Sequence, residues 1–267
     1  MKYETIIFDQ RDRAACITLN RPERLNAISG EMITELNDAY RRIEEDPDIW
    51  CYIVTGAGDR ALCAGADVGK MPGVRNGSSQ PVLASASQWD APQEATPPYL
   101  QMTKPMICAV NGLAAGAGLD LVTTSDIAIA ATEATFFDPH VSIGIVSGRE
   151  MVRLARVLPL NVAMRVALMG KHERVTAQRA YELGLVSELV PLPSLVERAW
   201  EIADTINRNA PLAVRGTRLA IRKGLSLPVY EAEVLAESHR LRVAGTEDAM
   251  EGPRAFMEKR DPEWKAQ

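Results

Sequence analysis

The sequence predicts an α/β protein whose C-terminal region is helical. Two apolar runs of strand length, residues 50–55 (WCYIVT) and 106–110 (MICAV), each stand beside glycine-containing turns and helical patterns. Such runs are typical of strands that are buried on both faces of a sheet. From residue 192 onward the apolar spacing is helical only. Because strands are followed by a run of helices, we expect an α/β core over residues 1–195 and a helical region over residues 196–267.

The composition of the 267-residue chain is that of an ordinary soluble globular protein, with 46% hydrophobic and 24% charged residues. The net charge of −5 argues against a nucleic-acid surface. No apolar run approaches the ~18 residues of a membrane span, and no signal peptide is recognised, so we expect a cytoplasmic protein with no membrane partner. The four cysteines form no CxxC or Cys/His cluster, and no metal site is predicted.

The N-terminal part of the chain predicts a hairpin, a helix and a buried strand. Residues 3–9 and 14–19 are short β-rich runs around a polar turn. Ser29 is placed to cap a helix that runs to about residue 45. Five apolar side chains recur at helical spacing along it: Met32, Leu36, Ala39, Tyr40 and Ile43. Residues 50–55 then form the first buried strand.

The next part of the chain is rich in turn residues. Glycines punctuate residues 56–65, and Asp67 is placed to cap a short helix. Residues 69–98 are rich in Pro, Ser, Gly and Ala and have little helical patterning. A loop of this length inside a compact domain usually has a function. We expect either a lid or a pocket wall here, with a surface insertion of no particular role as the alternative.

The remaining elements follow from periodicity and from turn residues. Strands are expected at residues 106–110, 127–130, 135–137 and 187–190. Helices are expected from residue 116 onward and at residues 147–158, 161–169, 176–183, 195–207, 211–223, 228–244 and 247–259.

A turn of small residues precedes the helix that begins near Gly116. Gly112, Gly116 and Gly118 leave bare backbone beside that helix start. Backbone amides in such a place can bind a developing negative charge. Asp120 follows in the first turn of the helix, and His140 lies in the next loop. The pattern indicates half of an active site. The plainer alternative is that the small residues only let the helix pack closely on the sheet.

Four segments together resemble the crotonase family, which is also called the enoyl-CoA hydratase/isomerase superfamily. They are residues 20–27 (NRPERLNA), 62–67 (LCAGAD), 104–118 (KPMICAVNGLAAGAG) and 137–144 (FDPHVSIG). Residues 255–264 (AFMEKRDPEW) also resemble the last helix of that family. The resemblance implies a crotonase-like spiral of ββα turns, assembled as a homotrimer or a dimer of trimers. It implies an acyl-CoA thioester as the substrate and no cofactor besides the coenzyme A of that substrate.

In the crotonase family two backbone amides hold the thioester oxygen while an enolate-like anion forms. The matching positions fall on Ala66 and Ala117. The residues agree with this assignment independently, because small side chains let a ligand approach the backbone and a helix beginning at Gly116 adds its dipole.

The acid–base positions depart from the family pattern. In the family's hydratases two glutamates hold a water molecule and add it across the conjugated double bond. Those positions fall on Asp120 and His140 here. Glu150 is a third candidate, because its helix starts near the pocket. The plainer alternatives are a first-turn helix carboxylate for Asp120 and Glu150, and a loop histidine that bonds to backbone for His140.

The activity that the resemblance implies is hydration of an enoyl-CoA. The two departures leave open isomerisation, hydrolysis of an acyl-CoA, or decarboxylation that uses Asp120 and His140. A non-catalytic protein that binds acyl-CoA is a further alternative.

Basic residues and the last helix supply candidate coenzyme A contacts. Arg21 and Arg24 fall where the family often has basic residues near the coenzyme A phosphates, with a solvated surface as the alternative. Asp138 is expected to be a turn residue or a support for the site. His172 and His239 are expected to be exposed and to have no role. The implied coenzyme A contacts are Arg24, Ala64, Gly65, Ala66, Asp67, Val68, Gly116, Phe256 and Lys259.

Overall fold

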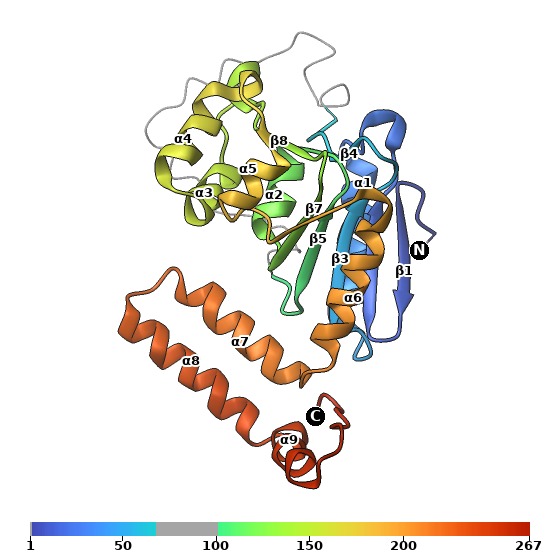
Figure 1. Cartoon of the computed structure of the whole chain (residues 1–267), viewed down its shortest axis with the longest axis vertical. Coiled ribbons are helices and arrows are strands. Elements are labelled where there is room, and N and C mark those ends of the chain that lie inside the picture. The colour runs from blue at the N-terminus through green and yellow to red at the C-terminus, as the bar shows by residue number, and fades with distance from the viewer. Residues whose placement is uncertain (1, 68–100) are drawn as a thin grey trace.

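The computed structural model describes residues 2–67 and 101–267 of the chain (Figure 1). Its largest sheet has six strands in the order β1-β2-β3-β5-β7-β10. β1 pairs antiparallel with β2, and every later neighbour pair in this sheet is parallel. The strands are β1 (Ile6–Arg11), β2 (Ala14–Leu19), β3 (Cys51–Gly56), β5 (Met106–Val110), β7 (Ile127–Ala131) and β10 (Glu188–Val190).

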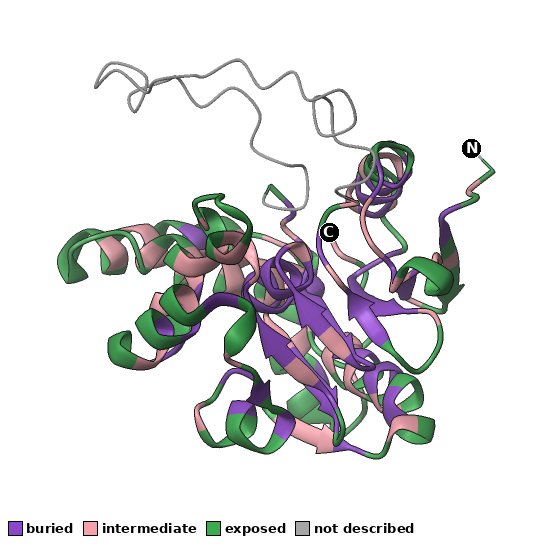
Figure 2. Ribbon diagram, turned by 90° about the horizontal axis from the view of Figure 1, so that it is seen from above, coloured by how far each residue is buried: buried purple, intermediate pink, exposed green. Residues whose placement is uncertain are grey.

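The two apolar runs that predicted the fold form the middle of this sheet. Every residue of β3 and of β5 is buried, which confirms the expected burial on both faces (Figure 2). The N-terminal hairpin is confirmed, with Ile6 opposite Leu19. Ser29 caps α1 as expected, because its hydroxyl accepts a hydrogen bond from the Met32 amide at 3.2 Å.

A second sheet of four short strands has the order β4-β6-β8-β9. Its strands are β4 (Ala61–Cys63), β6 (Leu113–Ala115), β8 (Thr135–Phe137) and β9 (Val175–Thr176). The chain passes from β3 to β4, from β5 to β6 and from β7 to β8, so each turn places one strand in each sheet. This arrangement confirms the expected spiral.

Three strands of the small sheet were not predicted from the sequence. Residues 61–63, 113–115 and 175–176 are runs of two or three residues. Such a run is too short to show a period of two, and the first two runs contain mainly small side chains. The pairing of β4 and β6 therefore follows from the longer strands β3 and β5 that precede them.

Helices cover both faces of the large sheet. Buried residues of α1, among them Met32 and Leu36, pack on the face that carries Ala15 and Ile17 of β2. Residues of α6, among them Trp200, pack on the opposite face. The helices are α1 (Gly30–Glu45), α2 (Ala117–Thr124), α3 (Arg149–Val157), α4 (Leu160–Met169), α5 (Ala177–Glu182), α6 (Leu195–Asn207), α7 (Pro211–Gly224), α8 (Val229–Ala244) and α9 (Glu247–Glu258).

The helical C-terminal region extends away from the sheets. The boundary expected after residue 195 falls at the start of α6, which packs on the sheet, while α7, α8 and α9 project beyond it (Figure 1). Asp126, at the start of β7, fastens α7 to the core. Its two carboxylate oxygens accept hydrogen bonds from Arg218 at 2.6 Å and from Arg222 at 2.8 Å.

The expectation that His239 is exposed is wrong, although His172 is exposed as expected. His239 lies on α8 and is only 9% exposed. Gly216 on α7 has no side chain to keep α8 away, and a β-carbon placed on it would lie 3.8 Å from the His239 β-carbon. The burial therefore comes from helix packing, which the polar sequence around His239 does not reveal.

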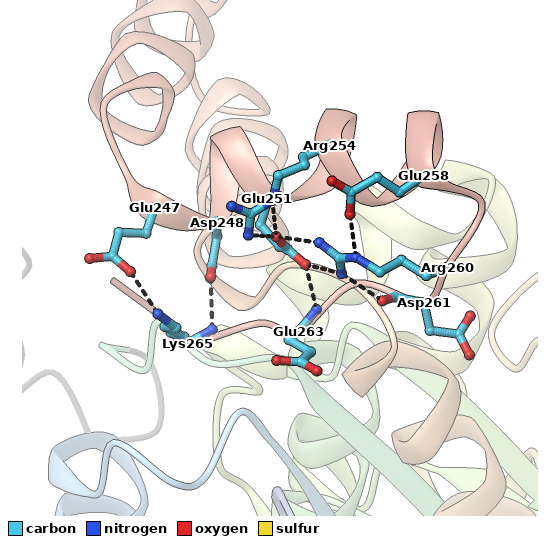
Figure 3. Close-up of polar contacts among 9 residues, drawn as sticks. All are labelled: Glu247, Asp248, Glu251, Arg254, Glu258, Arg260, Asp261, Glu263 and Lys265. Atoms are coloured by element: carbon cyan, nitrogen blue, oxygen red, sulfur yellow. Dashed lines mark hydrogen bonds and ion pairs between the residues drawn. The ribbon is translucent and has the colours of Figure 1, made fainter.

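The last residues of the chain are bound back onto α9 (Figure 3). Glu251 accepts hydrogen bonds from Arg254, from Arg260 and from the Glu263 backbone amide, the last at 3.0 Å. Asp248 accepts hydrogen bonds from two backbone amides of the last three residues, at 2.8 and 3.0 Å. Buried carboxylates thus fix the path of the C-terminal segment.

Two negative findings hold for residues 2–67 and 101–267. No helix there is long and apolar enough to cross a bilayer. No group of three or more His, Cys, Asp or Glu side chains there is arranged to bind a metal ion.

Candidate active site

Two tight turns meet where the small-sheet strands β4 and β6 end. Gly65 follows β4 with a φ of +106°, and Gly116 follows β6 with a φ of +53°. Residues with a side chain rarely adopt such angles. A β-carbon placed on Gly116 would lie 3.6 Å from the Gly65 α-carbon, so the two turns are in direct contact. The spiral therefore brings together segments that lie about fifty residues apart in the sequence.

The amides of Ala66 and Ala117 follow these glycines. Ala66 forms a parallel bridge with Ile28, in which the Ile28 amide donates to the Gly65 carbonyl and the Asp67 amide donates to the Ile28 carbonyl, both at 2.9 Å. This pairing turns the Ala66 amide away from Ile28. Ala117 is the first residue of α2, where amides have no partner within the helix. Neither amide donates to another residue in the part of the chain that the structure describes.

Close packing of α2 on β4 holds the two turns together. A β-carbon on Gly118 would lie 2.2 Å from the Cys63 carbonyl oxygen, so only glycine fits there. The Cys63 sulfur accepts a hydrogen bond from the Gly65 amide at 3.3 Å. Burial raises the pKa of the Cys63 thiol to about 11, which keeps this group neutral beneath the turn. The small residues therefore serve close packing and also leave two amides available.

His140 lies beside the second turn and is bound to Asp138. The His140 Nδ1 atom is 2.7 Å from the Asp138 Oδ1 atom. Asp138 directly follows β8 and is fully buried, and its Oδ2 atom has no hydrogen-bond partner among the residues that the structure describes. A β-carbon on Gly116 would lie 3.4 Å from the His140 Cε1 atom, so the imidazole ring rests against the turn. Asp138 thereby fixes the orientation of the ring.

Asp120 is bound to a different partner. It is only 3% exposed on the first turn of α2, and its carboxylate accepts a hydrogen bond from Arg153 of α3. Arg153 also donates to the Thr124 hydroxyl at 2.8 Å. Asp120 and His140 line the same cavity, but each binds a different polar partner. Asp138 binds His140, and Arg153 binds Asp120.

A cavity of about 320 Å³ connects these groups. Ala66, Ala117, Asp120 and His140 all line it. The other lining residues come from α1 and the segment before it, from α2 and from the first turn of α3. They are Ile28, Ile33, Leu36, Asn37, Tyr40, Leu121, Arg149 and Glu150. The arrangement places two amide donors and an imidazole around one small, mostly apolar space.

A larger hollow of about 920 Å³ lies between α7 and the core. Its lining includes Asp126, Arg218, Arg222 and Trp264, but neither amide turn and no histidine. Its charged groups are already engaged in fastening α7. The smaller cavity is therefore the candidate site.

Comparison with known proteins agrees with this geometry. Residues 9–267 match the model of the enoyl-CoA hydratase/isomerase family. The chain belongs to this family, the crotonases. It is 34% identical over 260 residues to an (E)-benzylidenesuccinyl-CoA hydratase from Thauera aromatica, covering 96% of this chain and 97% of that protein. It is 35% identical over 271 residues to the mitochondrial enoyl-CoA hydratase of Pongo abelii, covering 99% and 89%.

Solved crotonase structures share the whole fold. A crystal structure of an enoyl-CoA hydratase/isomerase from Mycobacterium paratuberculosis is 58% identical, with a TM-score of 0.87 and 99% coverage of both chains. An enoyl-CoA hydratase from Bacillus anthracis is 31% identical, also with a TM-score of 0.87, and covers 99% of this chain and all of that one. Family membership implies an acyl-CoA substrate for this crotonase.

The coenzyme A contacts expected from the crotonase pattern fall in two places. Residues 64–67 and Gly116 lie at the paired turns, and Arg24 is exposed near them in the short helix Pro22–Arg24. Phe256 and Lys259 lie at the end of α9, where Phe256 is 85% exposed. Val68, the expected helix after Asp67 and the expected lid at 69–98 lie outside the described residues.

Two polar partners in this crotonase were not predicted from the sequence. Arg153 lies thirty-three residues after Asp120, and no local motif links them. Arg21 was expected near the coenzyme A phosphates, but its guanidinium binds the Ala27 carbonyl at 2.6 Å and the Asp67 carboxylate at 2.8 Å. Asp138 was expected only as a turn residue or support. Its position two residues before His140 was the available signal for the pair.

Proposed function

We propose that this crotonase is an enoyl-CoA hydratase in which His140, held by Asp138, does the acid–base work. The observation that carries the proposal is the 2.7 Å contact between His140 Nδ1 and Asp138 Oδ1 beside the two amide turns. In this proposal the Asp138 carboxylate accepts the Nδ1 hydrogen, which leaves Nε2 as a base. The names of the enoyl-CoA hydratases to which the chain is similar support the same reaction.

The amides of Ala66 and Ala117 bind the thioester oxygen in this proposal. As water adds to the β-carbon of the enoyl group, negative charge moves onto that oxygen and an enolate forms. Preorganised amide donors stabilise the charge where it develops, and removing one such donor typically costs about 100- to 1,000-fold in kcat. The dipole of α2 adds to the stabilisation at Ala117.

His140 moves the proton in this proposal. Its Nε2 atom accepts a proton from the attacking water while the oxygen forms a bond to the β-carbon. The imidazolium then returns a proton to the α-carbon and the enolate collapses to the saturated thioester. The sum is the addition of one water molecule across the double bond, with His140 regenerated. The Asp138 carboxylate faces the imidazolium and offsets its charge.

Asp120 is assigned a supporting role because Arg153 already binds its carboxylate. Asp120 lines the same cavity as His140, where its carboxylate is placed to help orient the attacking water. Glu150 also lines the cavity and is the second candidate for this task. Neither group is required to transfer a proton in the proposed reaction.

Incubation with enoyl-CoAs of several chain lengths tests the proposal. The conjugated enoyl absorbance is expected to fall, and mass spectrometry of the product is expected to show the gain of one water. A protein that binds these thioesters but does not hydrate any of them would refute the hydratase proposal. Loss of activity in His140→Ala without loss of binding would link the reaction to His140.

Hydrolysis of the thioester is a second candidate function. It is favoured by the engagement of Asp120 with Arg153, because hydrolysis needs a single base and His140, oriented by Asp138, is placed to supply it. Attack of water on the thioester carbonyl would give a free acid and free coenzyme A. Detection of free thiol in the same incubations separates this outcome from hydration.

We also propose that Phe256 and Lys259 contact the adenine end of coenzyme A in a neighbouring subunit of a trimer. Both lie on the projecting α9, and several apolar side chains of α7–α9 are exposed, as is typical of surfaces that associate. Light scattering in solution is expected to give a trimer or a dimer of trimers. A monomer that still binds coenzyme A with full affinity would contradict this assignment.

A further inference from the structure

We infer that Arg21 is a positioning residue that fixes the direction of the Ala66 amide. The inference rests on the proposed role of that amide in binding the thioester oxygen. Arg21 follows β2, and its side chain is only 12% exposed. Its Nη1 atom donates to the Ala27 carbonyl at 2.6 Å, and its Nη2 atom donates to the Asp67 carboxylate at 2.8 Å.

The two groups that Arg21 holds lie on opposite sides of the bridge that contains Ala66. Ala27 precedes Ile28, and Asp67 follows Ala66. The bridge itself consists of two backbone hydrogen bonds of 2.9 Å between Ile28 and the residues that flank Ala66. The two segments are also joined by the Ala64 amide, which donates to the Leu25 carbonyl at 3.0 Å. The guanidinium adds a side-chain link beside the Ile28–Ala66 pair. Its planar fork sets their separation, because both donors belong to one rigid group.

The contribution of Arg21 is one of position more than of charge. Asp67 is its ion-pair partner, and the side chains of the pair are 12% and 17% exposed. A paired cation places little net charge near the thioester oxygen. The same two hydrogen bonds turn the Nη1 and Nη2 donors of Arg21 toward Ala27 and Asp67.

Loss of the fork would let the Ala66 amide move relative to the Ala117 amide. A displacement of about 1 Å at a reacting group can cost about 100-fold in rate. Arg21→Gln is therefore expected to lower kcat by about 100-fold. Because the interaction matters mainly in the transition state, KM is expected to change much less than kcat.

A spectroscopic probe tests the inference independently of turnover. Cinnamoyl-CoA is conjugated through its carbonyl, so polarisation of the thioester oxygen by amide donors shifts its absorption to longer wavelength. The measurement is made in a His140→Ala background, so that the probe is not consumed. The variants are His140→Ala alone, and the same with Arg21→Gln, with Arg21→Lys or with Arg13→Gln.

Arg13→Gln is the matched control. Arg13 is also an arginine paired with an aspartate, Asp48, but it lies at the opposite end of the strands, before β2, and its side chain is 43% exposed. The shift is expected in His140→Ala, with Arg13→Gln leaving it unchanged and Arg21→Gln abolishing it. Arg21→Lys keeps the charge and protects the fold, but a single ammonium does not reproduce the rigid fork, so an intermediate shift is expected.

The outcomes separate this inference from the proposed function. A full shift with Arg21→Gln or with Arg21→Lys would overturn the positioning role. Absence of any shift in His140→Ala would overturn both the role of the amides and that of Arg21. A shift that depends on Arg21, in a protein that hydrates no enoyl-CoA, would support the inference and refute only the hydratase proposal.

Discussion

Asp138 in the candidate site and Glu251 on α9 are both buried carboxylates, but their surroundings differ. Within the described part of the chain, fully buried Asp138 binds one group, His140, and its second oxygen has no partner. Glu251 is 6% exposed, and both of its oxygens accept hydrogen bonds (Figure 3). The hydrogen bonds from Arg260, the Glu263 amide and Arg254 hold the pKa of Glu251 well below its usual range.

The difference distinguishes a carboxylate that stabilises the fold from one that orients a catalytic group. A carboxylate that only holds the chain is surrounded by donors, since each unmade hydrogen bond to a buried charge lowers stability. A carboxylate that orients a reacting group keeps one strong contact to that group. Incomplete hydrogen bonding beside a cavity is therefore a pointer to function, whereas the number of ion pairs is not.

The largest effect is expected from His140→Ala, which removes the group that Asp138 orients. General acid–base catalysis typically contributes about 100- to 10,000-fold, so kcat for enoyl-CoA hydration is expected to fall by about 1,000-fold. Binding is expected to persist, because neither amide turn is altered. Steady-state kinetics and isothermal titration with a saturated acyl-CoA measure the two quantities, and an unchanged kcat would remove His140 from the mechanism.

A smaller loss is expected from Asp138→Asn. The side chain keeps its size, but an amide can offer a donor to Nδ1 and so favour the tautomer in which Nε2 is not a base. We expect kcat to fall by about 100-fold with little change in KM. If the variant hydrates enoyl-CoA as fast as the wild type, the contrast drawn between Asp138 and Glu251 has no functional meaning.

Glu251→Gln is expected to affect stability and leave the chemical step unchanged. The substitution weakens the contacts to Arg254 and Arg260 and so loosens the C-terminal segment. Hydrogen exchange of residues 262–267 is expected to speed up, and kcat at saturating substrate is expected to stay at the wild-type value. A fall in kcat comparable to that of Asp138→Asn would show that the α9 network is coupled to the site.

The smallest expected effect is on the pH dependence of folding stability, and it comes from the titration of Glu251. A carboxyl whose folded-state pKa is depressed stabilises the fold above its unfolded pKa, about 4.3 for Glu, and this contribution is lost as the pH falls below that value. The wild type is therefore expected to melt at a higher temperature than Glu251→Gln near neutral pH. The two melting temperatures should converge in acid, and a gap that widens there would contradict a lowered pKa for Glu251.

Much of the fold was predictable because its signals are local. Ser29 and the apolar spacing after it predicted α1, and residues 50–55 and 106–110 predicted the centre of the large sheet. The small sheet was largely missed, since β4 and β6 have only three residues each and pair through the geometry of longer neighbours. The spiral was predicted from the order of the family motifs, because periodicity alone does not indicate how the strands are connected in space.

Several residues that line the candidate cavity were predictable from the sequence, but the polar partner of each was not. The glycine turns indicated that amides would be available near Ala66 and Ala117, and the structure places those turns in contact. The partners of His140 and Asp120 depend on how α2, α3 and β8 pack. Nothing in the spacing of Arg153 or Arg21 reveals which carboxylate each will bind. Their roles emerge only from three-dimensional packing.

The contact between Gly116 and His140 has a consequence for comparing relatives of this protein. A β-carbon at position 116 would make only ordinary contact with the imidazole, at 3.4 Å, but the φ of +53° at this position itself favours glycine. Relatives are therefore expected to retain glycine at position 116 whichever side chain stands at position 140. Position 140 alone thus offers a sequence marker for sorting crotonases by the group that handles the proton.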